Sequence, residues 1–309
     1  MCGIVGYIGY EQAAPLLLKG LEKLEYRGYD SAGIAVYDGS GLEIYKSKGR
    51  LKILSDMIEG GAKVKGTVGI GHTRWATHGE PSDINSHPHG NKRVSIVHNG
   101  IIENYKQIKD FLIEEGYSFV SETDTETVAK LLDYYYVDDP VDTIIKVLSE
   151  IKGSYALGIM FRDYPDTVFA VRKECPLIVG VGENENFLAS DVPAIIKYTR
   201  DYYLLEANEI AVVKKDSVQF YDMHKEPVHK EINTADWDVD AAEKGGYEHF
   251  MLKEIHEQPA AVRDTVSPRI INGMPDLSQD GVDMQKLKDY RQIFIVACGT
   301  AMQDRKSVV

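Results

Sequence analysis

The second residue of the chain, Cys2, combines two groups that nucleophilic catalysis needs. If Met1 is removed after synthesis, Cys2 carries a free α-amine beside its thiol. The thiolate is the nucleophilic form of cysteine, and an adjacent base activates the thiol. The α-amine has an ordinary pKa of roughly 8, so it can take that proton near neutral pH. A cysteine after Met1 can also be a chance small residue, but the apolar, glycine-punctuated segment at 2–9 favours the catalytic interpretation.

The densest polar stretch, 72–81, leaves a predicted strand and enters a loop that contains Gly and Pro. Arg74 offers a planar, charged fork that suits a substrate carboxylate. Trp75 can cover a small ligand, and Thr77 can donate a hydroxyl. The same residues are compatible with an ordinary surface loop around a packed Trp, and this stretch alone favours that interpretation.

A second stretch, 97–100, ends a predicted strand with Asn99 and Gly100. The amide of Asn99 and the backbone N–H of Gly100 can both point at one oxygen, which is the form of an oxyanion hole. Asn-Gly is also the most typical tight-turn dipeptide, so the dipeptide alone favours a turn.

The third stretch, 121–126, has the pattern of a helix N-terminus. Thr123 and Glu126 fit a capping box, and Asp124 is then an acid in the first turn. Asp124 can also pair with an ammonium group. Both interpretations can hold at once.

Taken together, these residues describe a single ligand. Arg74 suits an α-carboxylate, Asp124 suits an α-ammonium, and Cys2 can attack a side-chain carbonyl whose oxyanion Asn99 and Gly100 hold. The matching ligand is an amino acid with a terminal amide, and glutamine fits. Five histidines lie between His72 and His98, but their spacing matches no zinc pattern, so we expect no metal and no cofactor.

Composition limits the other classes of function. The chain has 309 residues, a formal charge of −13 and a pI of about 5.2, with scattered Lys and Arg, so nucleic acid is not expected as a partner. We expect no signal peptide and no membrane span. The three cysteines are few and far apart, which indicates a reducing cytoplasm.

The elements that must position these residues follow from hydrophobic periodicity. The sequence predicts a strand at 2–9, a helix at 11–24 and short strands between 33 and 98. Helices follow at 103–115, at 124–137 and from Pro140 to before Gly153, and further strands between 155 and 221, hence a layered α+β sandwich. A polar, acidic stretch at 233–246 reads as a linker. It separates a domain at 1–232 from a segment at 247–309, where an apolar strand at 292–297 runs into Thr300.

The chain closely resembles the glutamine–fructose-6-phosphate aminotransferases. The resemblance rests on CGIVGYIG at 2–9, LEKLEYRGYDSAG at 21–33, GHTRWATHGEPS at 71–82, HPH at 87–89, VHNGIIENY at 97–105, SETDTE at 121–126, KGSYAL at 152–157, ASD at 189–191 and EKGGYEHFMLKEIHEQP at 243–259. It implies a four-layer αββα N-terminal-nucleophile hydrolase fold, that of a class II glutamine amidotransferase, followed by the truncated start of an α/β sugar-isomerase domain.

The resemblance also implies roles for individual residues. Cys2 is the nucleophile, Asn99 and Gly100 form the oxyanion hole, and Arg74, Thr77, His78 and Asp124 surround glutamine. Trp75 gates the path of ammonia, and Thr300 lies in a phosphate-binding turn that is incomplete here, since Ala301 stands where the family usually has Ser.

The intact enzyme of this family would pass the ammonia to fructose 6-phosphate, giving glucosamine 6-phosphate, and would act as a cytoplasmic homodimer. Two alternatives stay open. One is the glutaminase half of a phosphoribosylpyrophosphate amidotransferase, against which the motif at 243–259 argues. The other is a non-catalytic binding module, which retention of Met1 would favour.

Overall fold

The computed structural model describes residues 2–235, 246–289 and 291. The chain divides into two units, Met1–Glu243 and Lys244–Val309. The first unit contains fourteen described strands: β1 (Gly3–Ile8), β2 (Ser31–Tyr37), β3 (Leu42–Lys48), β4 (Val68–Arg74), β5 (His89–Gly90), β6 (Val94–Ile102), β7 (Gly153–Phe161), β8 (Val168–Lys173), β9 (Ile178–Val181), β10 (Asn186–Ala189), β11 (Asp201–Leu204), β12 (Ile210–Val213), β13 (Val218–Tyr221) and β14 (Asn233–Thr234).

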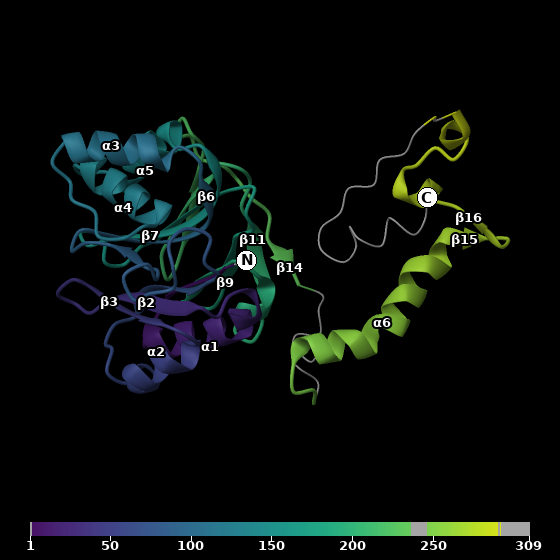
Figure 1. Ribbon diagram of the computed structural model, residues 1–309, viewed down its shortest axis with the longest axis horizontal. Helices are drawn as coiled ribbons and strands as arrows, with labels where there is room; N and C mark the ends of the chain where they lie inside the picture. Colours follow the sequence, from purple (N-terminus) through teal and green to yellow (C-terminus); the bar gives the residue numbers. More distant parts are fainter. Residues whose placement is uncertain (1, 236–245, 290, 292–309) are drawn as a thin grey trace. The chain divides into compact units, whose positions relative to one another are not determined.

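These strands form two antiparallel sheets. One has eight strands in the order β14-β11-β9-β10-β1-β4-β2-β3, and the other has six in the order β13-β12-β8-β7-β6-β5. The α-helices of this unit are α1 (Ala13–Leu24), α2 (Leu51–Met57), α3 (Tyr105–Glu114), α4 (Asp124–Tyr135) and α5 (Pro140–Glu150). Figure 1 shows α1 and α2 beside the strands β2 and β3, and α3, α4 and α5 on the opposite side of the unit.

Three groups of buried apolar side chains hold the four layers together. One joins α1 and α2 to the larger sheet, and another joins α3, α4 and α5 to the smaller sheet. The third lies between the two sheets and includes Ile70, Val97 and Leu188. Because both faces of each sheet are covered, the central strands are buried along their whole length, as in β1 and β4. The predicted four-layer α+β sandwich is confirmed.

Local sequence explains where two of the helices begin. The Thr123 hydroxyl accepts a hydrogen bond from the N–H of Glu126 at 3.2 Å and caps α4. Asp139 caps α5 through the N–H groups of Val141 and Asp142, and Pro140 occupies the first turn, where its missing N–H is tolerated.

The structure differs from the predicted elements in several places. The sequence did not predict α2 or β11, and β6 continues four residues beyond the predicted end at 98. Strand β14 pairs with β11, so the sheet extends into the first two residues of the predicted linker at 233–246. Most of that linker lies outside the described residues.

The second unit contains the helix α6 (Phe250–Val266), which has Pro259 inside it, and a hairpin of β15 (Ile270–Ile271) and β16 (Met274–Pro275). The strand predicted at 292–297 lies outside the described residues, so the sugar-isomerase start remains a prediction. Among the helices that the structure describes, none combines the length and the hydropathy that crossing a bilayer requires.

The core between the sheets leads to a prediction about stability. Leu188 is 1% exposed and packs against Gly6 and Gly158. Leu188→Ala should lower the free energy of unfolding by about 2–5 kcal/mol, because the side chain leaves a cavity that the two sheets cannot close. The control Ile113→Ala changes a side chain on α3 that is 51% exposed, and it should have little effect. Equal losses in urea denaturation would contradict this account.

Candidate active site

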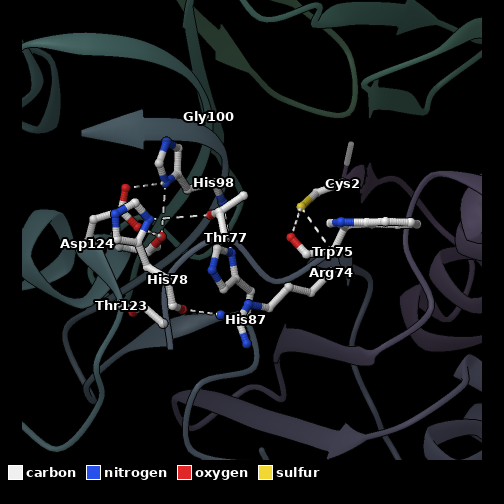
Figure 2. Close-up of a pocket in the computed structure, with 11 residues that line it drawn as sticks. Cys2, Arg74, Trp75, Thr77, His78, His87, His98, Gly100, Thr123 and Asp124 are labelled. Atoms are coloured by element: carbon white, nitrogen blue, oxygen red, sulfur yellow. Dashed lines mark hydrogen bonds and ion pairs between the residues drawn. The ribbon is translucent and has the colours of Figure 1, made fainter. Parts of the chain in front are cut away.

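The pairing of β1 with β4 places the first candidate residue. Gly3 lies opposite Thr73 in the antiparallel register, so Cys2 falls beside the end of β4 at Arg74 and Trp75. The Cys2 sulfur accepts a hydrogen bond from the N–H of Trp75 at 3.2 Å and lies 3.5 Å from the carbonyl of the same residue. The thiol is thereby fixed against one peptide unit, as Figure 2 shows.

A pocket of about 270 Å³ opens beside this sulfur. It brings together five separate parts of the sequence: Cys2, Arg74, Trp75, Thr77, His78, His87, His98, Gly100, Thr123, Asp124 and Thr125.

Arg74 contributes an unused donor to this pocket. Its Nη2 donates to the carbonyls of His78 and, at 3.0 Å, Gly79, which holds the guanidinium in place. Its Nη1 is buried and has no hydrogen-bond partner among the described residues. A buried cationic nitrogen without a partner is unfavourable, so the site is arranged for an anionic ligand group.

Asp124 supplies the opposite charge. It is the first residue of α4, and its Oδ2 accepts a hydrogen bond from the N–H of Ile102 at 2.8 Å. The carboxylate is buried, and Nδ1 of His98 lies 4.0 Å away. The pocket therefore contains one fixed cation and one fixed anion, which suits a zwitterionic ligand such as an amino acid.

The capping box predicted at this helix is only half formed. Thr123 caps α4, but the Glu126 carboxylate accepts from the N–H groups of Val120, at 3.1 and 3.2 Å, and Ser121, at 2.6 Å, and not from Thr123. The carboxylate thus orders the segment that precedes the cap.

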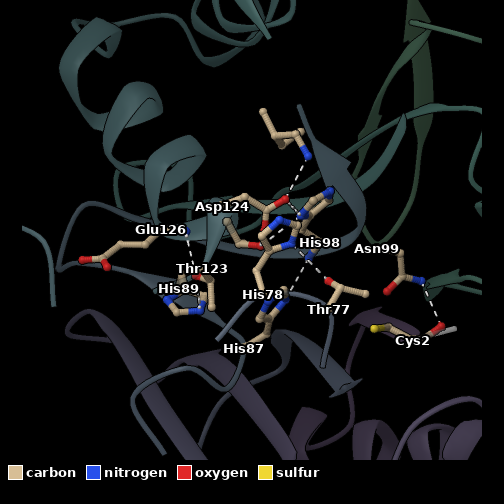
Figure 3. A network of polar contacts seen from close by, with 12 residues as sticks. Cys2, Thr77, His78, His87, His89, His98, Asn99, Thr123, Asp124 and Glu126 are labelled. Carbon is tan, nitrogen blue, oxygen red and sulfur yellow. Dashed lines mark hydrogen bonds and ion pairs between the residues drawn. The ribbon is translucent and has the colours of Figure 1, made fainter. Parts of the chain in front are cut away.

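Asn99 and Gly100 lie inside β6, so the tight-turn interpretation of this dipeptide is wrong. Gly100 pairs with Tyr155 and has a φ of +128°, and a Cβ at this position would lie 2.1 Å from the carbonyl oxygen of Ser154. Only glycine fits there. The Nδ2 of Asn99 donates to the carbonyl of Cys2 at 3.1 Å, as Figure 3 shows.

Trp75, Thr77 and His78, which the resemblance also assigned to the site, line the same pocket. Trp75 is 49% exposed and makes an edge-on contact with Tyr29, at 5.6 Å between ring centroids. The Thr77 hydroxyl lies 3.4 Å from Nδ1 of His78, whose ring packs edge-on against Tyr105. Thr300 lies outside the described residues. Within the described part of the chain, His, Cys, Asp and Glu side chains form no group of three or more that could hold a metal ion.

Four buried imidazoles that the sequence did not assign to the site lie together here: His87 and His98 line the pocket, and His72 and His89 are close to them. The rings of His72 and His87 stack at 4.2 Å, and His89 makes an edge-on contact with His87 at 5.0 Å. Burial lowers the pKa of His72 to about 3, and burial lowers the pKa of His87 and of His89 well below the usual range. These rings are therefore neutral at pH 7.

Asp30 is a second residue whose role the sequence did not reveal. Its carboxylate accepts a hydrogen bond from the N–H of Ala76, and its own N–H donates to the carbonyl of Arg74 at 3.2 Å. Asp30 therefore fixes the turn that carries Trp75. Asp30 lies in the stretch 21–33, which indicated the resemblance to a family but did not predict that Asp30 contacts the residues around Trp75.

The environment of Cys2 keeps its thiol protonated. Burial raises the pKa of the Cys2 thiol, the hydrogen bond from the Trp75 backbone lowers it, and the nearby Asp30 charge raises it; the net effect is a rise. A thiol of this kind needs a proton acceptor before it can attack.

Comparison with known proteins finds one matching family model and relatives that align with nearly the whole chain. Residues 72–197 match the family described as "Glutamine amidotransferase domain". A glutamine–fructose-6-phosphate aminotransferase (isomerizing) from Caldanaerobacter subterraneus subsp. tengcongensis is 59% identical over 97% of this chain, and one from Aquifex aeolicus is 47% identical over 97%. Both alignments cover 50% of the relative, so the chain spans about half the length of the curated relatives it matches.

Solved structures show the same fold. The glutamine phosphoribosylpyrophosphate amidotransferase from B. subtilis, complexed with ADP and GMP, matches with a TM-score of 0.63 and 28% identity, over 72% of this chain and 49% of that one. A glutamine aminotransferase class-II domain protein from Silicibacter pomeroyi matches with a TM-score of 0.52 and 15% identity, over 72% of this chain and 99% of that one, and shows the fold alone. The predicted class II amidotransferase fold is confirmed.

Burial lowers the pKa of His98 as well, so all four buried imidazoles predict a pH dependence of stability. Unfolded histidines titrate near pH 6.5, so below that pH the unfolded chain binds more protons than the folded one, and stability falls as pH falls. Between pH 7 and 5 the free energy of unfolding should decrease, by up to about 1.4 kcal/mol per pH unit for each such histidine. His87→Gln should reduce this slope in chemical denaturation, whereas His224→Gln, at an exposed position, should not. Identical slopes in all three proteins would contradict the account.

Proposed function

Because the chain carries a domain of the glutamine amidotransferase family, we propose that its Cys2 thiol hydrolyses the side-chain amide of glutamine. The observation that carries the proposal is the pocket itself. It places a thiol beside an unpartnered Arg74 nitrogen and a buried Asp124 carboxylate, and an amino acid with a reactive side chain can engage all three at once.

Glutamine fits the pocket because its α-carboxylate and α-ammonium match the two charges and its side-chain amide can react with the thiol. Its α-carboxylate pairs with Nη1 of Arg74, and its α-ammonium pairs with the Asp124 carboxylate. Each contact gives a buried charged group an opposite charge, without which its burial would be energetically unfavourable. Thr77 and His78 line the space between and hydrogen-bond the bound amino acid.

The reaction proceeds through a thioester. The Cys2 sulfur attacks the side-chain carbonyl carbon, and the thiol proton goes to a base, from which it passes to the departing nitrogen. The carbon–nitrogen bond breaks and ammonia leaves. Water then attacks the thioester, giving glutamate and regenerating the thiol. Two steps with lower barriers replace one difficult hydrolysis.

The base is the α-amine of Cys2, which is free once Met1 is removed. A cysteine attacks as its thiolate, and few thiolates of an ordinary thiol exist at neutral pH unless an adjacent base takes the proton. An amine with an ordinary pKa of roughly 8 can accept the proton and return it within one turnover.

Asn99 and the N–H of Gly100 stabilise the oxyanion that forms during the attack. The amide nitrogen of Asn99 carries two hydrogens, and one already reaches the Cys2 carbonyl, so the second is available next to the nucleophile. These donors already point at the position of the oxyanion before the reaction begins. They therefore stabilise the transition state without a rearrangement of the site, which lowers the activation barrier.

The destination of the ammonia is part of the same proposal. By analogy with the relatives, the intact protein transfers ammonia to fructose 6-phosphate as a cytoplasmic homodimer, with Trp75 at the exit of the pocket and Thr300 in the sugar-phosphate site. The phosphoribosylpyrophosphate type is less supported, because identity to that structure is 28% against 59% for the aminotransferase. A non-catalytic module remains the interpretation if Met1 is retained.

Removal of the nucleophile gives the most direct kinetic prediction. Cys2→Ala should abolish glutamate release from glutamine, because no other group in the pocket can form the thioester. The matched control is Cys175→Ala, which changes a half-buried free thiol outside the pocket lining and should leave the rate unchanged. Intact mass should show wild-type protein without Met1. Glutamate release by Cys2→Ala at the wild-type rate would refute the proposal.

The charged residues should affect binding, and the oxyanion donor should affect turnover. Arg74→Ala and Asp124→Asn should each raise KM for glutamine by about tenfold or more, since each leaves a buried charge of the substrate without its partner. Asn99→Ala should lower kcat by about a hundredfold or more with a smaller change in KM.

The control for these variants is Arg93→Ala. Arg93 pairs with Asp133 at 3.2 Å, away from the pocket lining, so its loss should change neither constant. Steady-state glutamate release measures all four variants. A kcat effect at Arg74 combined with a KM effect at Asn99 would reverse the assignments.

A further inference from the structure

His72 connects the two sheets directly behind the oxyanion donor. It lies on β4 in the larger sheet and is completely buried. Its Nε2 lies 3.0 Å from the carbonyl oxygen of His98 and 3.0 Å from Oδ1 of Asn99, both of which belong to β6 in the smaller sheet. A single ring nitrogen therefore contacts the backbone and the side chain of adjacent residues.

The backbone contact fixes the position of the proton. A carbonyl oxygen can only accept, so Nε2 of His72 carries the hydrogen that the His98 carbonyl receives. The Asn99 atom that shares this hydrogen must then be the amide oxygen, because the amide nitrogen would bring a second donor against the first. The amide oxygen and nitrogen of Asn99 are similar in shape, so shape does not assign them. The donor at Nε2 of His72 does, because only the amide oxygen can accept its hydrogen.

The orientation of Asn99 determines which atom faces the nucleophile. With its oxygen on His72, the Asn99 amide presents Nδ2 to Cys2, where it donates to the Cys2 carbonyl at 3.1 Å. The opposite orientation would place an acceptor there, and it would repel a developing oxyanion.

The ring of His72 is itself held in place. It stacks on His87 at 4.2 Å with 24° between the planes, and its Nδ1 has no hydrogen-bond partner among the described residues. The ring therefore has no second polar contact that would favour the flipped orientation, whereas Nε2 has two acceptors.

We propose that His72 is a positioning residue for the oxyanion hole: its Nε2–H fixes the Asn99 amide so that the nitrogen, and not the oxygen, faces Cys2. This inference rests on the proposed glutamine hydrolysis. His72 touches neither the substrate nor the thiol, and it acts only through Asn99.

Two amide variants separate positioning from a merely structural role. The Nε2 of a glutamine side chain can occupy the place of the histidine Nε2, whereas an asparagine is shorter and reaches only the place of Nδ1. His72→Asn should lower kcat for glutamate release by about tenfold or more, with KM for glutamine within about twofold of wild type. His72→Gln should restore most of kcat. Equal kcat in both variants and wild type would overturn the proposal.

A double variant tests whether His72 acts through Asn99. In the Asn99→Ala background the amide is absent, so adding His72→Asn should lower kcat by no more than about twofold. A full additional tenfold loss would show that His72 acts independently of Asn99 and would overturn the proposal. Thermal unfolding of each variant verifies that the enzyme assayed is folded.

A measurement on the wild-type protein covers the case in which the His72 variants do not fold. Nitrogen-15 NMR of the histidine-labelled protein should show His72 as the neutral tautomer with hydrogen on Nε2. Hydrogen on Nδ1 would overturn the proposal. Failure of the proposed function itself is distinguishable, because either the wild-type protein would release no glutamate or Cys2→Ala would still release it, whereas the NMR measurement of the His72 tautomer does not depend on activity.

Discussion

The register of β1 against β4 is the constraint on which the site depends. It places Gly3 opposite Thr73, and therefore sets Cys2 against the peptide unit of Trp75 and next to Arg74. The same two strands lie in the interior of the eight-stranded sheet, buried on both faces. A slip by one residue would turn every side chain of β1 to the other face, so core packing and the position of the nucleophile are specified together.

The second sheet supplies the groups that face the thiol, and neutral imidazoles join the two. Because His72, His87, His89 and His98 are buried, each must stay uncharged, and each can then act as a donor or acceptor without the desolvation penalty of an ion. The charged groups of the pocket are Arg74 and Asp124, and each is fixed by a backbone contact: Arg74 donates to the carbonyl of Gly79, and Asp124 accepts from the N–H of Ile102. Polar groups behind the site are thus mostly satisfied within the protein, while those in the pocket are left for glutamine.

The sequence predicted the parts of this arrangement that follow from local pattern. Periodicity located most strands and helices, and the capping residue Thr123 and the polar stretches around Arg74 and Asn99 marked the site. It did not predict that Asn99 and Gly100 lie within β6, because the turn propensity of Asn-Gly is overridden by pairing with β7 and by the close approach of Ser154, which only a glycine permits. Nor could it predict His72, whose contact with Asn99 joins residues of two different sheets and depends on tertiary packing alone.

The central claim is that Cys2 attacks the side-chain carbonyl of glutamine in this pocket. The most direct measurement is mass spectrometry of the chain after reaction with an electrophilic glutamine analogue that bears a diazoketone in place of the amide. The account predicts a single adduct on Cys2, formed more slowly when glutamine is present and much more slowly in Arg74→Ala. Labelling of Cys175 or Cys298 in place of Cys2, or labelling of Cys2 that glutamine does not slow, would contradict it.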